Sequence, residues 1–263
     1  MNKIEILKQI ALDAGKIVKE GYHANKEITH KGIVDLVTEY DVKTEDFILE
    51  KLKKYFPDHT LVGEESHPQS DNDSYHDDKA IYIDPIDGTT NFIHGIPYLA
   101  ISLGVWEKGE PMMAVVYNPI LEEMFWAVKG EGAYCNETKL TVSTQEKLQQ
   151  SLVATGFPYA KVNQGIEYRW VIKCMTNILP HIQDIRRLGA AAVDLCYLAQ
   201  GKTEAFYEID LKPWDVAGGI LVLLEAGGKV SNVHNKKFDF DDKSLVASNG
   251  RIHEQLLKYL ELI

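Results

Sequence analysis

Apolar residues recur every three or four positions along several stretches of the chain, the spacing that places side chains on one face of an α-helix. The pattern is clearest near the N-terminus, where Leu7, Ile10 and Ala14 follow it. A polar face lies opposite, so residues 3–20 are predicted to form an amphipathic helix. The predicted helices are 3–20, 41 to about 56, about 164–179, 189–200, 215–226 and a terminal helix from about 251.

Short runs of β-branched and aromatic residues, bounded by turn residues, predict strands between these helices. From 98 to 134 the runs are separated by EKGEP, NPILEE and VKGEG, which is typical of an antiparallel meander. Strands that alternate with helices predict an α/β fold of stacked layers, and a polar stretch at 141–150 predicts a boundary between subdomains 1–145 and 146–263. The other predicted strands are 33–40, 59–63, 79–83, 151–156, 182–188, 203–209, 228–233 and 244–249.

The net charge of the chain argues against some kinds of binding partner. The 263-residue chain carries a net charge of −11 without a block of lysines or arginines, so it lacks the basic stripe that nucleic acids and anionic membranes demand. Cys135, Cys174 and Cys196 show no CxxC spacing, which favours packing roles in a cytoplasmic protein over disulfides or zinc. Charges interrupt the N-terminus, and the longest apolar run is too short to span a bilayer, so neither a signal peptide nor an anchor is predicted.

One stretch concentrates groups that can carry chemistry. In IDPIDGTT, Asp84 ends a strand-like run, Pro85 forces a turn, and Asp87 follows three positions after the first carboxylate. The Ile86 carbonyl can point toward both carboxylates, and the amides of Gly88 and the two threonines are the free donors of a short helix start, which suits an anion. Two interpretations are open: a turn in which Asp87 caps that helix, or a divalent-cation site beside an oxyanion.

Three further acids stand at strand ends or helix starts: Glu64, Asp215 and Asp41. Each has an ordinary interpretation, since Glu64 resembles a surface loop acid and the two aspartates resemble helix N-caps. Together with Asp84 and Asp87 they offer oxygen ligands from several segments, which is the donor set that hard cations need. Because no histidines or thiolates stand at ligand spacing, the sequence favours Mg²⁺ over Zn²⁺.

Three motifs, in order and at fitting distances, resemble the signatures of the inositol monophosphatase family: GEES at 63–66, DPIDGTTNF at 84–92 and WDVAGG at 214–219. The similarity covers nearly the whole chain and includes VDLVTEYD at 34–41 and IRRLGAAAVDL at 185–195. The resemblance implies an α-β-α-β-α sandwich with its active site between the subdomains. It also implies a Mg²⁺-dependent phosphatase that is usually a homodimer and is often inhibited by lithium.

The resemblance further implies the metal ligands. Glu64, Asp84 and the Ile86 carbonyl would hold a first Mg²⁺, and Asp84, Asp87 and Asp215 a second, while a third and weaker ion would rest on Glu64 and water. The physical argument agrees, because a nest of carboxylates repels a phosphate dianion unless two or three cations reverse the field. Such ions can also acidify a bound water and stabilise the leaving alkoxide.

The remaining roles implied by the resemblance concern water and substrate. Thr89, hydrogen-bonded to Asp41, would orient the attacking water, and the amides of Gly88 and Thr89 would bind the phosphate. Glu208 and the region of Ala191 would contact the hydroxyls of a sugar or polyol. A threonine hydroxyl is no base by itself, but with Asp41 accepting its proton it can accept a hydrogen bond from water and aim it.

Several phosphate esters that this family hydrolyses are candidate substrates. Inositol 1-phosphate is the first choice, and fructose 1,6-bisphosphate, histidinol phosphate and NADP are the alternatives. Ala190 stands where the family often has Ser or Thr, and Arg187, beside Arg186, adds a second cation that favours a substrate with extra negative charge. The resemblance implies that Asp87 and Asp215 contact the substrate as well as the metal.

Other activities fit the sequence less well. GKT at 201–203 follows a helix and lacks the upstream glycine of a P-loop, and DNDSYHDD at 71–78 lacks the glycine and glutamate of a calcium loop and is interpreted as a solvated loop. A glycosidase also uses two acids, but Asp84 and Asp87 share one tight turn, which suits a bridging metal better. The alternative of a different class is a module that binds cation and anion without turnover.

Overall fold

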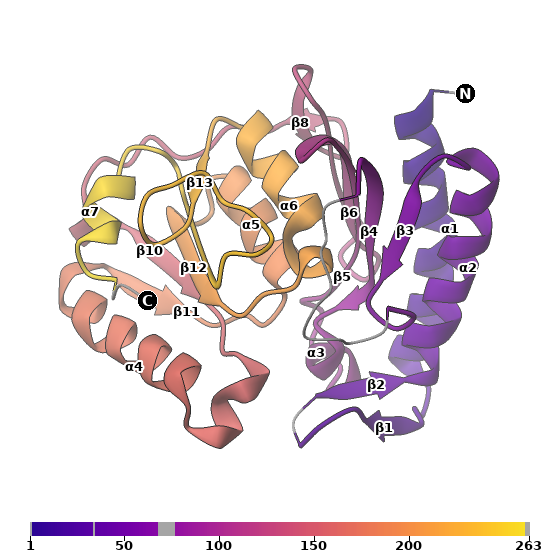
Figure 1. The fold of residues 1–263 in the computed structure, drawn as a ribbon, viewed down its shortest axis with the longest axis horizontal. Coiled ribbons are helices and arrows are strands. Elements are labelled where there is room, and N and C mark those ends of the chain that lie inside the picture. The colour runs from indigo at the N-terminus through magenta and orange to yellow at the C-terminus, as the bar shows by residue number, and fades with distance from the viewer. Residues whose placement is uncertain (1, 34, 68–76, 261–263) are drawn as a thin grey trace.

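A computed structural model describes residues 2–33, 35–67 and 77–260. Helices and sheets stack in five layers, which run from right to left in Figure 1 from the pair α1 and α2 to the pair α4 and α7. The predicted α-β-α-β-α sandwich is therefore confirmed. Most of the predicted loop 71–78 and the last three residues of the predicted terminal helix lie outside the described residues.

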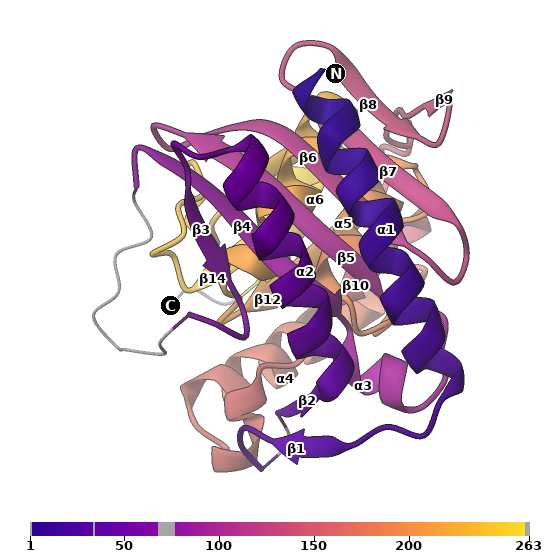
Figure 2. The same ribbon diagram turned by 90° about the vertical axis from the view of Figure 1, so that its right-hand side faces the viewer.

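The first layer is a pair of helices, α1 (Lys3–His23) and α2 (Glu39–Tyr55), which lie side by side across one face of the larger sheet (Figure 2). Their buried sides carry the apolar positions of the sequence pattern, fully buried Leu7 among them. Helix α2 begins two residues before the predicted Asp41. Thr38 is the N-cap, and Asp41 stands at the third helical position, where its carboxylate accepts a hydrogen bond of 2.8 Å from the Thr38 amide.

The larger sheet has seven strands in the order β3-β4-β5-β6-β7-β8-β9, antiparallel except between β3 and β4. The predicted meander is confirmed as β5 to β8. Strand β4 runs past the predicted end at 83, because a bulge between Asp84 and Asp87 sets two of its residues opposite one residue of β5. The bounds are β3 Thr60–Gly63, β4 Lys79–Asp87, β5 Ala100–Glu107, β6 Glu110–Asn118, β7 Glu123–Val128, β8 Gly132–Cys135 and β9 Thr138–Lys139.

The smaller sheet has the order β11-β10-β12-β14-β13. Strand β10 is parallel to both its neighbours, and the remaining pairs are antiparallel. All five strands lie where the sequence predicts them. The bounds are β10 Leu152–Thr155, β11 Asp184–Arg186, β12 Ala205–Ile209, β13 Lys229–Ser231 and β14 Ser244–Ser248.

Helices α5 (Ala191–Ala199) and α6 (Pro213–Glu225) form the layer between the two sheets. Helix α6 begins two residues before the predicted 215, because proline at the first helical position has a suitable φ and needs no amide partner. Its backbone lies close against β5, since a Cβ at Gly104 would come within 2.7 Å of the Ala217 Cβ. Glycine is therefore required where strand and helix touch.

The outer layer over the smaller sheet consists of α4 (Ile166–Ile178) and the short α7 (His253–Leu257). The three cysteines are buried in the core clusters, as predicted for packing residues. Two small elements border the cleft described below. They are the hairpin of β1 (Ile28–His30) with β2 (Leu36–Thr38), and the 3₁₀ helix η2 (Tyr159–Asn163).

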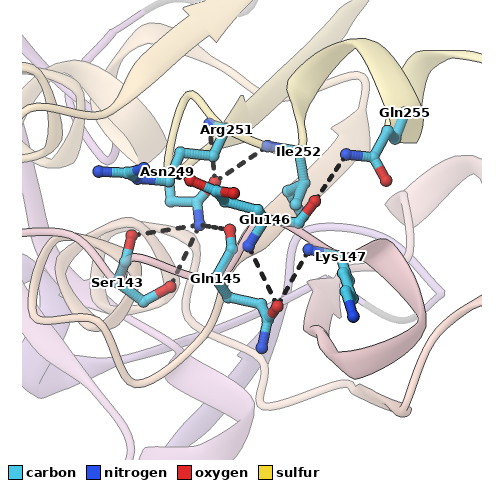
Figure 3. Close-up of polar contacts among 8 residues, drawn as sticks. All are labelled: Ser143, Gln145, Glu146, Lys147, Asn249, Arg251, Ile252 and Gln255. Carbon is cyan, nitrogen blue, oxygen red and sulfur yellow. Dashed lines mark hydrogen bonds and ion pairs between the residues drawn. The ribbon is translucent and has the colours of Figure 1, made fainter.

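The connection from the larger to the smaller sheet is fixed to the segment between β14 and α7 by a set of polar contacts, here called the Asn249 cluster (Figure 3). The Asn249 carboxamide donates to the Gln145 carbonyl at 2.8 Å and to both oxygens of Ser143 at 3.2 Å. Its oxygen accepts the amides of Arg251 and Ile252. The cluster comprises Ser143, Gln145, Glu146, Lys147, Asn249, Arg251, Ile252 and Gln255.

No helix among the described residues is both long and apolar enough to cross a membrane. The division into two subdomains at about residue 145 stays a prediction.

Candidate active site

A cavity of about 620 Å³ opens where the ends of several elements from both sheets meet. Its walls come from the end of β4 and the start of α3 (Thr89–Ile93), the first turn of α5, the end of β12 and the first turn of α6. The β1–β2 hairpin and residues 156–161 border it from two sides. This volume lies within the range of small-molecule sites.

The bulge at the end of β4 sets the geometry of the motif. The Asp84 carboxylate accepts the Ile86 amide at 3.0 Å, which holds the intervening Pro85 in a local turn. Gly88 follows with φ of +93°, and a Cβ there would lie 3.0 Å from the Tyr98 carbonyl oxygen and 3.2 Å from the Ala190 Cβ. Only glycine suits both this dihedral and this close approach.

Thr89, the first residue of α3, is tied to a residue 48 positions earlier in the chain. Its hydroxyl lies 3.0 Å from Asp41 Oδ1 and 3.1 Å from the Ile86 carbonyl oxygen, so its single proton bonds to one of them at a time. The other Asp41 oxygen accepts both the amide and the hydroxyl of Thr38. Burial raises the pKa of Asp41, and the hydrogen bonds from Thr38 and Thr89 oppose that rise.

Asp87 does not cap the short helix that follows it. Helix α3 has Gly88 as its N-cap and no side-chain cap, so the capping interpretation of Asp87 is wrong for this helix. Its two carboxylate oxygens instead accept the amides of Ala191 and Ala192, at 3.1 and 2.8 Å, in the first turn of α5. The carboxylate thus binds the free donors of a helix more than 100 residues away, which brings the α5 start to the end of β4.

Glu64 lies just after β3, where its amide bonds to the Ile83 carbonyl of β4. A cation from the β1–β2 connection reaches it: Lys31 Nζ is 2.6 Å from the Glu65 carboxylate and 3.4 Å from Glu64 Oε1. Burial lowers the pKa of Lys31, but the charges of Glu64 and Glu65 outweigh it, so the pKa lies above its ordinary value. Lys31 therefore stays an ammonium beside these two acids.

Asp215 stands at the third position of α6, where its carboxylate accepts the Lys212 amide at 2.6 Å. The structure therefore places it inside the first turn, as the reciprocal partner of an N-cap amide. Burial raises the pKa of Asp215 to about 7, with the Lys212 amide acting in the opposite direction.

Glu64, Asp84, Asp87 and Asp215, here called the acid cluster, repel one another. Burial and then the charges of Glu64 and Asp87 raise the pKa of Asp84 well above its ordinary value. Burial and the charge of Asp215 do the same to the pKa of Asp87. Within the described parts of the chain, no three Asp, Glu, His or Cys side chains already lie close enough to hold one ion. The cluster offers only oxygen donors whose repulsion a cation would relieve, which fits a hard metal ion.

The far side of the cavity carries groups suited to hydroxyls and anions. Glu208, on β12, is buried, and burial raises its pKa while Arg187 opposes the rise. A Cβ at Gly156 would come within 2.1 Å of the Glu208 carboxyl carbon, so glycine makes room for this side chain. The Arg187 guanidinium lies 5.3 Å from the centre of the Phe157 ring, and Lys161 also lines the cavity.

The cavity lining includes seven of the eleven predicted site residues, and four lie outside it. Asp41 and the Ile86 carbonyl are joined to the lining through Thr89, and Asp84 interacts electrostatically with Asp87 and Asp215. Glu64 interacts with Asp215. The residues in the lining are Asp87, Gly88, Thr89, Arg187, Ala191, Glu208 and Asp215, and those outside it are Asp41, Glu64, Asp84 and Ile86.

The sequence interpretation missed Asp194, which lines the cavity from the first turn of α5. Its carboxylate accepts the Tyr98 hydroxyl at 2.9 Å, and burial raises its pKa to about 7. Asn91, two residues after Thr89, donates to the carbonyls of Tyr98 and Leu188 and so joins α3 to the segment before α5. Asp194 lies in the stretch IRRLGAAAVDL. The sequence signal for it is the helical period, which places Asp194 one turn after Ala191.

Comparison with known sequences gives a match over the whole chain. The profile described as "Inositol monophosphatase family" matches residues 2–263. "Inositol monophosphatase 3" of Solanum lycopersicum is 37% identical over 262 residues, which are 98% of this chain and 96% of the relative. "Fructose-1,6-bisphosphatase/inositol-1-monophosphatase" of Aquifex aeolicus is 36% identical, with 98% and 97% covered.

Solved structures show the same fold. The extragenic suppressor protein suhB from Bartonella henselae superimposes with a TM-score of 0.90 at 34% identity, and 99% of each chain is covered. Because the match covers nearly all of both chains, the two proteins share one fold over their whole described length.

Proposed function

The chain belongs to the inositol monophosphatase family and is a phosphoric monoester hydrolase, and from this premise we propose that it hydrolyses inositol 1-phosphate with Mg²⁺. The observation that carries the proposal is the hydrogen bond of 3.0 Å from Thr89 to Asp41, made beside the acid cluster. An acid cluster alone suits cation storage, whereas a hydroxyl bonded to a buried carboxylate next to it suits the positioning of water.

Members of this family depend on metal ions, and the residues present fit them. Glu64, Asp84 and the Ile86 carbonyl would hold one Mg²⁺, Asp84, Asp87 and Asp215 a second, and Glu64 with water a third. When bound, these ions supply positive charge that attracts the ester, acidifies water and stabilises the leaving oxygen. Charge neutralisation would also let the carboxylates approach one another, since repulsion is what raises their pKa values after burial.

The chain's own groups would bind and orient the reactants. Asp41 Oδ1 accepts the Thr89 proton, which leaves the lone pairs of the Thr89 oxygen free to accept a hydrogen bond from the attacking water. The amides of Gly88 and Thr89 would donate to the phosphate oxygens. Glu208 and the start of α5 at Ala191 would receive the polyol hydroxyls.

The second substrate to consider is fructose 1,6-bisphosphate. Arg187 and Lys161 both line the cavity, and Arg187 interacts with Lys161 closely enough to contribute, after burial, to the lowered pKa of the lysine. Two mutually repelling cations are relieved by an anion, so a second phosphate would be held there. Arg187→Ala should then reduce kcat/KM for the bisphosphate about tenfold more than for inositol 1-phosphate. Equal losses on the two esters would contradict this specificity.

The proposal is tested by assaying inositol 1-phosphate, fructose 1,6-bisphosphate, histidinol phosphate and NADP with Mg²⁺, with EDTA and with Mg²⁺ plus lithium. Hydrolysis should require Mg²⁺ and fall with lithium. Asp87→Asn should lose most turnover and keep the native circular dichroism spectrum, while Asp46→Asn, an exposed acid on α2, should match the wild type. Hydrolysis that survives EDTA contradicts the metal proposal, and Mg²⁺ binding without turnover on any ester favours the non-enzymatic module.

The assembly proposed for this chain is a homodimer, which light scattering on the purified protein would measure directly. A cytoplasmic location stays a prediction.

A further inference from the structure

A second cavity, of about 490 Å³, lies at the opposite end of β4 from the acid cluster. It is bounded by the residues just before β4, by the turn between β5 and β6, and by the connection from β13 to β14, whose Phe240 packs against Tyr82 of β4. We call it the Phe240 cavity. Its volume falls in the range of small-molecule sites, and none of its described lining residues also lines the candidate active site.

The wall of the Phe240 cavity contains a packed group of aromatic rings. The half-buried Phe240 ring centre lies 4.8 Å from that of Tyr82 and 4.5 Å from that of Trp106. Tyr82 and Trp106 are buried, and the Trp106 indole donates to the Ala217 carbonyl at 3.2 Å. Phe238, 6.1 Å from Phe240, adds a fourth ring. The wall is therefore apolar and fixed to α6 and β4.

The rim of the cavity is mainly negative. Asp77 and Asp78 lie on the β4 side and Asp239 on the β13–β14 side. Of the two lysines among the described lining residues, Lys237 forms an ion pair with Glu110, which lies outside the lining and also pairs with Lys129. The described lining residues thus carry three carboxylates against two ammonium groups, in a chain whose net charge is −11.

We propose that the Phe240 cavity binds a small organic cation, an ammonium or guanidinium compound with a hydrocarbon body. Aromatic ring faces attract cations, and the apolar wall would take the hydrocarbon part while the carboxylates take the charge. An anion of the same size would meet three carboxylates and two ammonium groups among the described lining residues, and one of these ammonium groups already pairs with Glu110. The size of the cavity fits a free small molecule better than a folded partner.

The position of the cavity gives the ligand contact with elements that also carry the acid cluster. Tyr82 stands two residues before Asp84 on the same face of β4, and Ala217, the acceptor of the Trp106 indole, stands two residues after Asp215 in α6. Trp106 is one of the four tryptophans of the chain, so occupancy of the cavity should change part of the tryptophan emission.

The test is isothermal titration of the full chain, in saturating Mg²⁺ so that the ligand does not bind at the acid cluster. The probes are phenylethylammonium and n-butylguanidinium, with 2-phenylethanol and n-butylurea as neutral counterparts. The cations should bind with one-to-one stoichiometry and change the part of the tryptophan emission that Trp106→Phe removes, and the neutral compounds should bind at least about tenfold more weakly. Equal binding of charged and neutral probes, or no binding of either up to millimolar concentration, would overturn the proposal.

The matched variants separate the cavity from the rest of the acidic surface. Asp77→Asn with Asp78→Asn should weaken cation binding about tenfold, because two exposed carboxylates are lost without a change in shape. Asp46→Asn should have no effect. Phe240→Leu keeps an apolar but smaller side chain and removes the ring, and should weaken binding severalfold. Unchanged affinity in the double variant would show that the cations bind elsewhere.

Discussion

The protein contains two buried polar regions that differ in how well their groups are paired. The acid cluster gathers four carboxylates whose pKa values are all raised, first by burial and then, for Glu64, Asp84 and Asp87, by one another. At the other end of the molecule, the Asn249 cluster and the adjacent His253 pair donors with acceptors throughout. The carboxylates of the acid cluster repel one another, whereas the polar groups around Asn249 and His253 are paired.

The pairing around His253 can be followed atom by atom. The Ser231 hydroxyl donates to the Asn232 carbonyl at 2.7 Å, so it accepts from His253 Nε2 at 2.9 Å. The Ser248 hydroxyl accepts the Gly250 amide and donates to His253 Nδ1 at 2.8 Å. These bonds fix a neutral imidazole with its proton on Nε2. Burial, and then the charge of Lys229, lower the pKa of His253 to about 4.

The difference distinguishes the residues that serve function from those that serve stability. Buried groups with raised pKa values and a shared cavity mark a site that a ligand completes, whereas a fully paired polar cluster holds chain segments together. Each region should therefore respond to substitution in its own way.

The largest effect should come from Asp84→Asn. The variant keeps the oxygen that accepts the Ile86 amide but loses a charge in the acid cluster. Activity should fall about 100-fold or more because a proposed metal ligand is lost. The metal-free protein should become more stable at pH 7 by on the order of 1 kcal/mol, because repulsion is removed. Steady-state kinetics and urea unfolding in EDTA measure the two effects, with Asp46→Asn as the control. A variant that is both active and no more stable would contradict the comparison.

The second prediction concerns a variant that should lose stability and keep activity, the opposite of Asp84→Asn. Asn249→Ala removes the carboxamide that joins the two segments of the Asn249 cluster and leaves buried partners unpaired. The free energy of unfolding should fall by about 3 kcal/mol, while kcat of the folded fraction stays unchanged. Asn249→Asp keeps the oxygen acceptor but sets a buried carboxylate oxygen against the Ser143 and Gln145 carbonyls, so it should cost at least as much. Loss of kcat in the folded variant would show that the cluster also positions the active site.

The two regions were not equally visible in the sequence. The hydrophobic period located most helices and every strand of the two sheets except the two-residue β9, because helix and strand periods are local. The α2 boundary was missed because Thr38 and Asp41 both resemble caps, and only the reciprocal hydrogen bonds of the capping box assign them. The bulge after Asp84 was missed because a proline turn and a bulge have the same local residues.

Long-range polar pairs could not be predicted at all. Asp87 bonds to Ala191 and Ala192 over more than 100 residues, and Asp194 bonds to Tyr98 over 96. No periodicity encodes such partners, since they depend on how separate elements pack. The motifs located the acid cluster because each lies at a strand end or a helix start, where side chains meet in layered folds.

The third prediction uses pH to separate the two regions. An unfolded histidine has a pKa near 6.5, and His253 has a folded pKa of about 4, so the unfolded state binds more protons between these values. The His253 contribution should therefore decrease stability by up to about 3 kcal/mol as pH falls from 6.5 to 4. The acid cluster should make the opposite contribution, so that it increases stability as pH falls. Its folded pKa values, such as about 7 for Asp215, lie above the unfolded ones, so acid relieves its repulsion.

Urea unfolding in EDTA at pH 7.5, 6 and 5 checks both signs. The stability difference between wild type and His253→Gln should shift against the wild type as pH falls. The advantage of Asp84→Asn over wild type should shrink over the same range. Parallel curves for wild type and His253→Gln would show that the imidazole does not take up the proton.

The smallest effect should come from the exposed edge of the Asn249 cluster. Arg251 and Glu146 form an ion pair of 2.7 Å, but their side chains are 47% and 71% exposed, so water and salt weaken the attraction. A double-mutant cycle with Arg251→Ala and Glu146→Ala should give a coupling energy of about 0.5 kcal/mol, which 1 M NaCl should remove. A coupling as large as the Asn249→Ala loss would mean that the charges, and not the buried carboxamide, join the two segments.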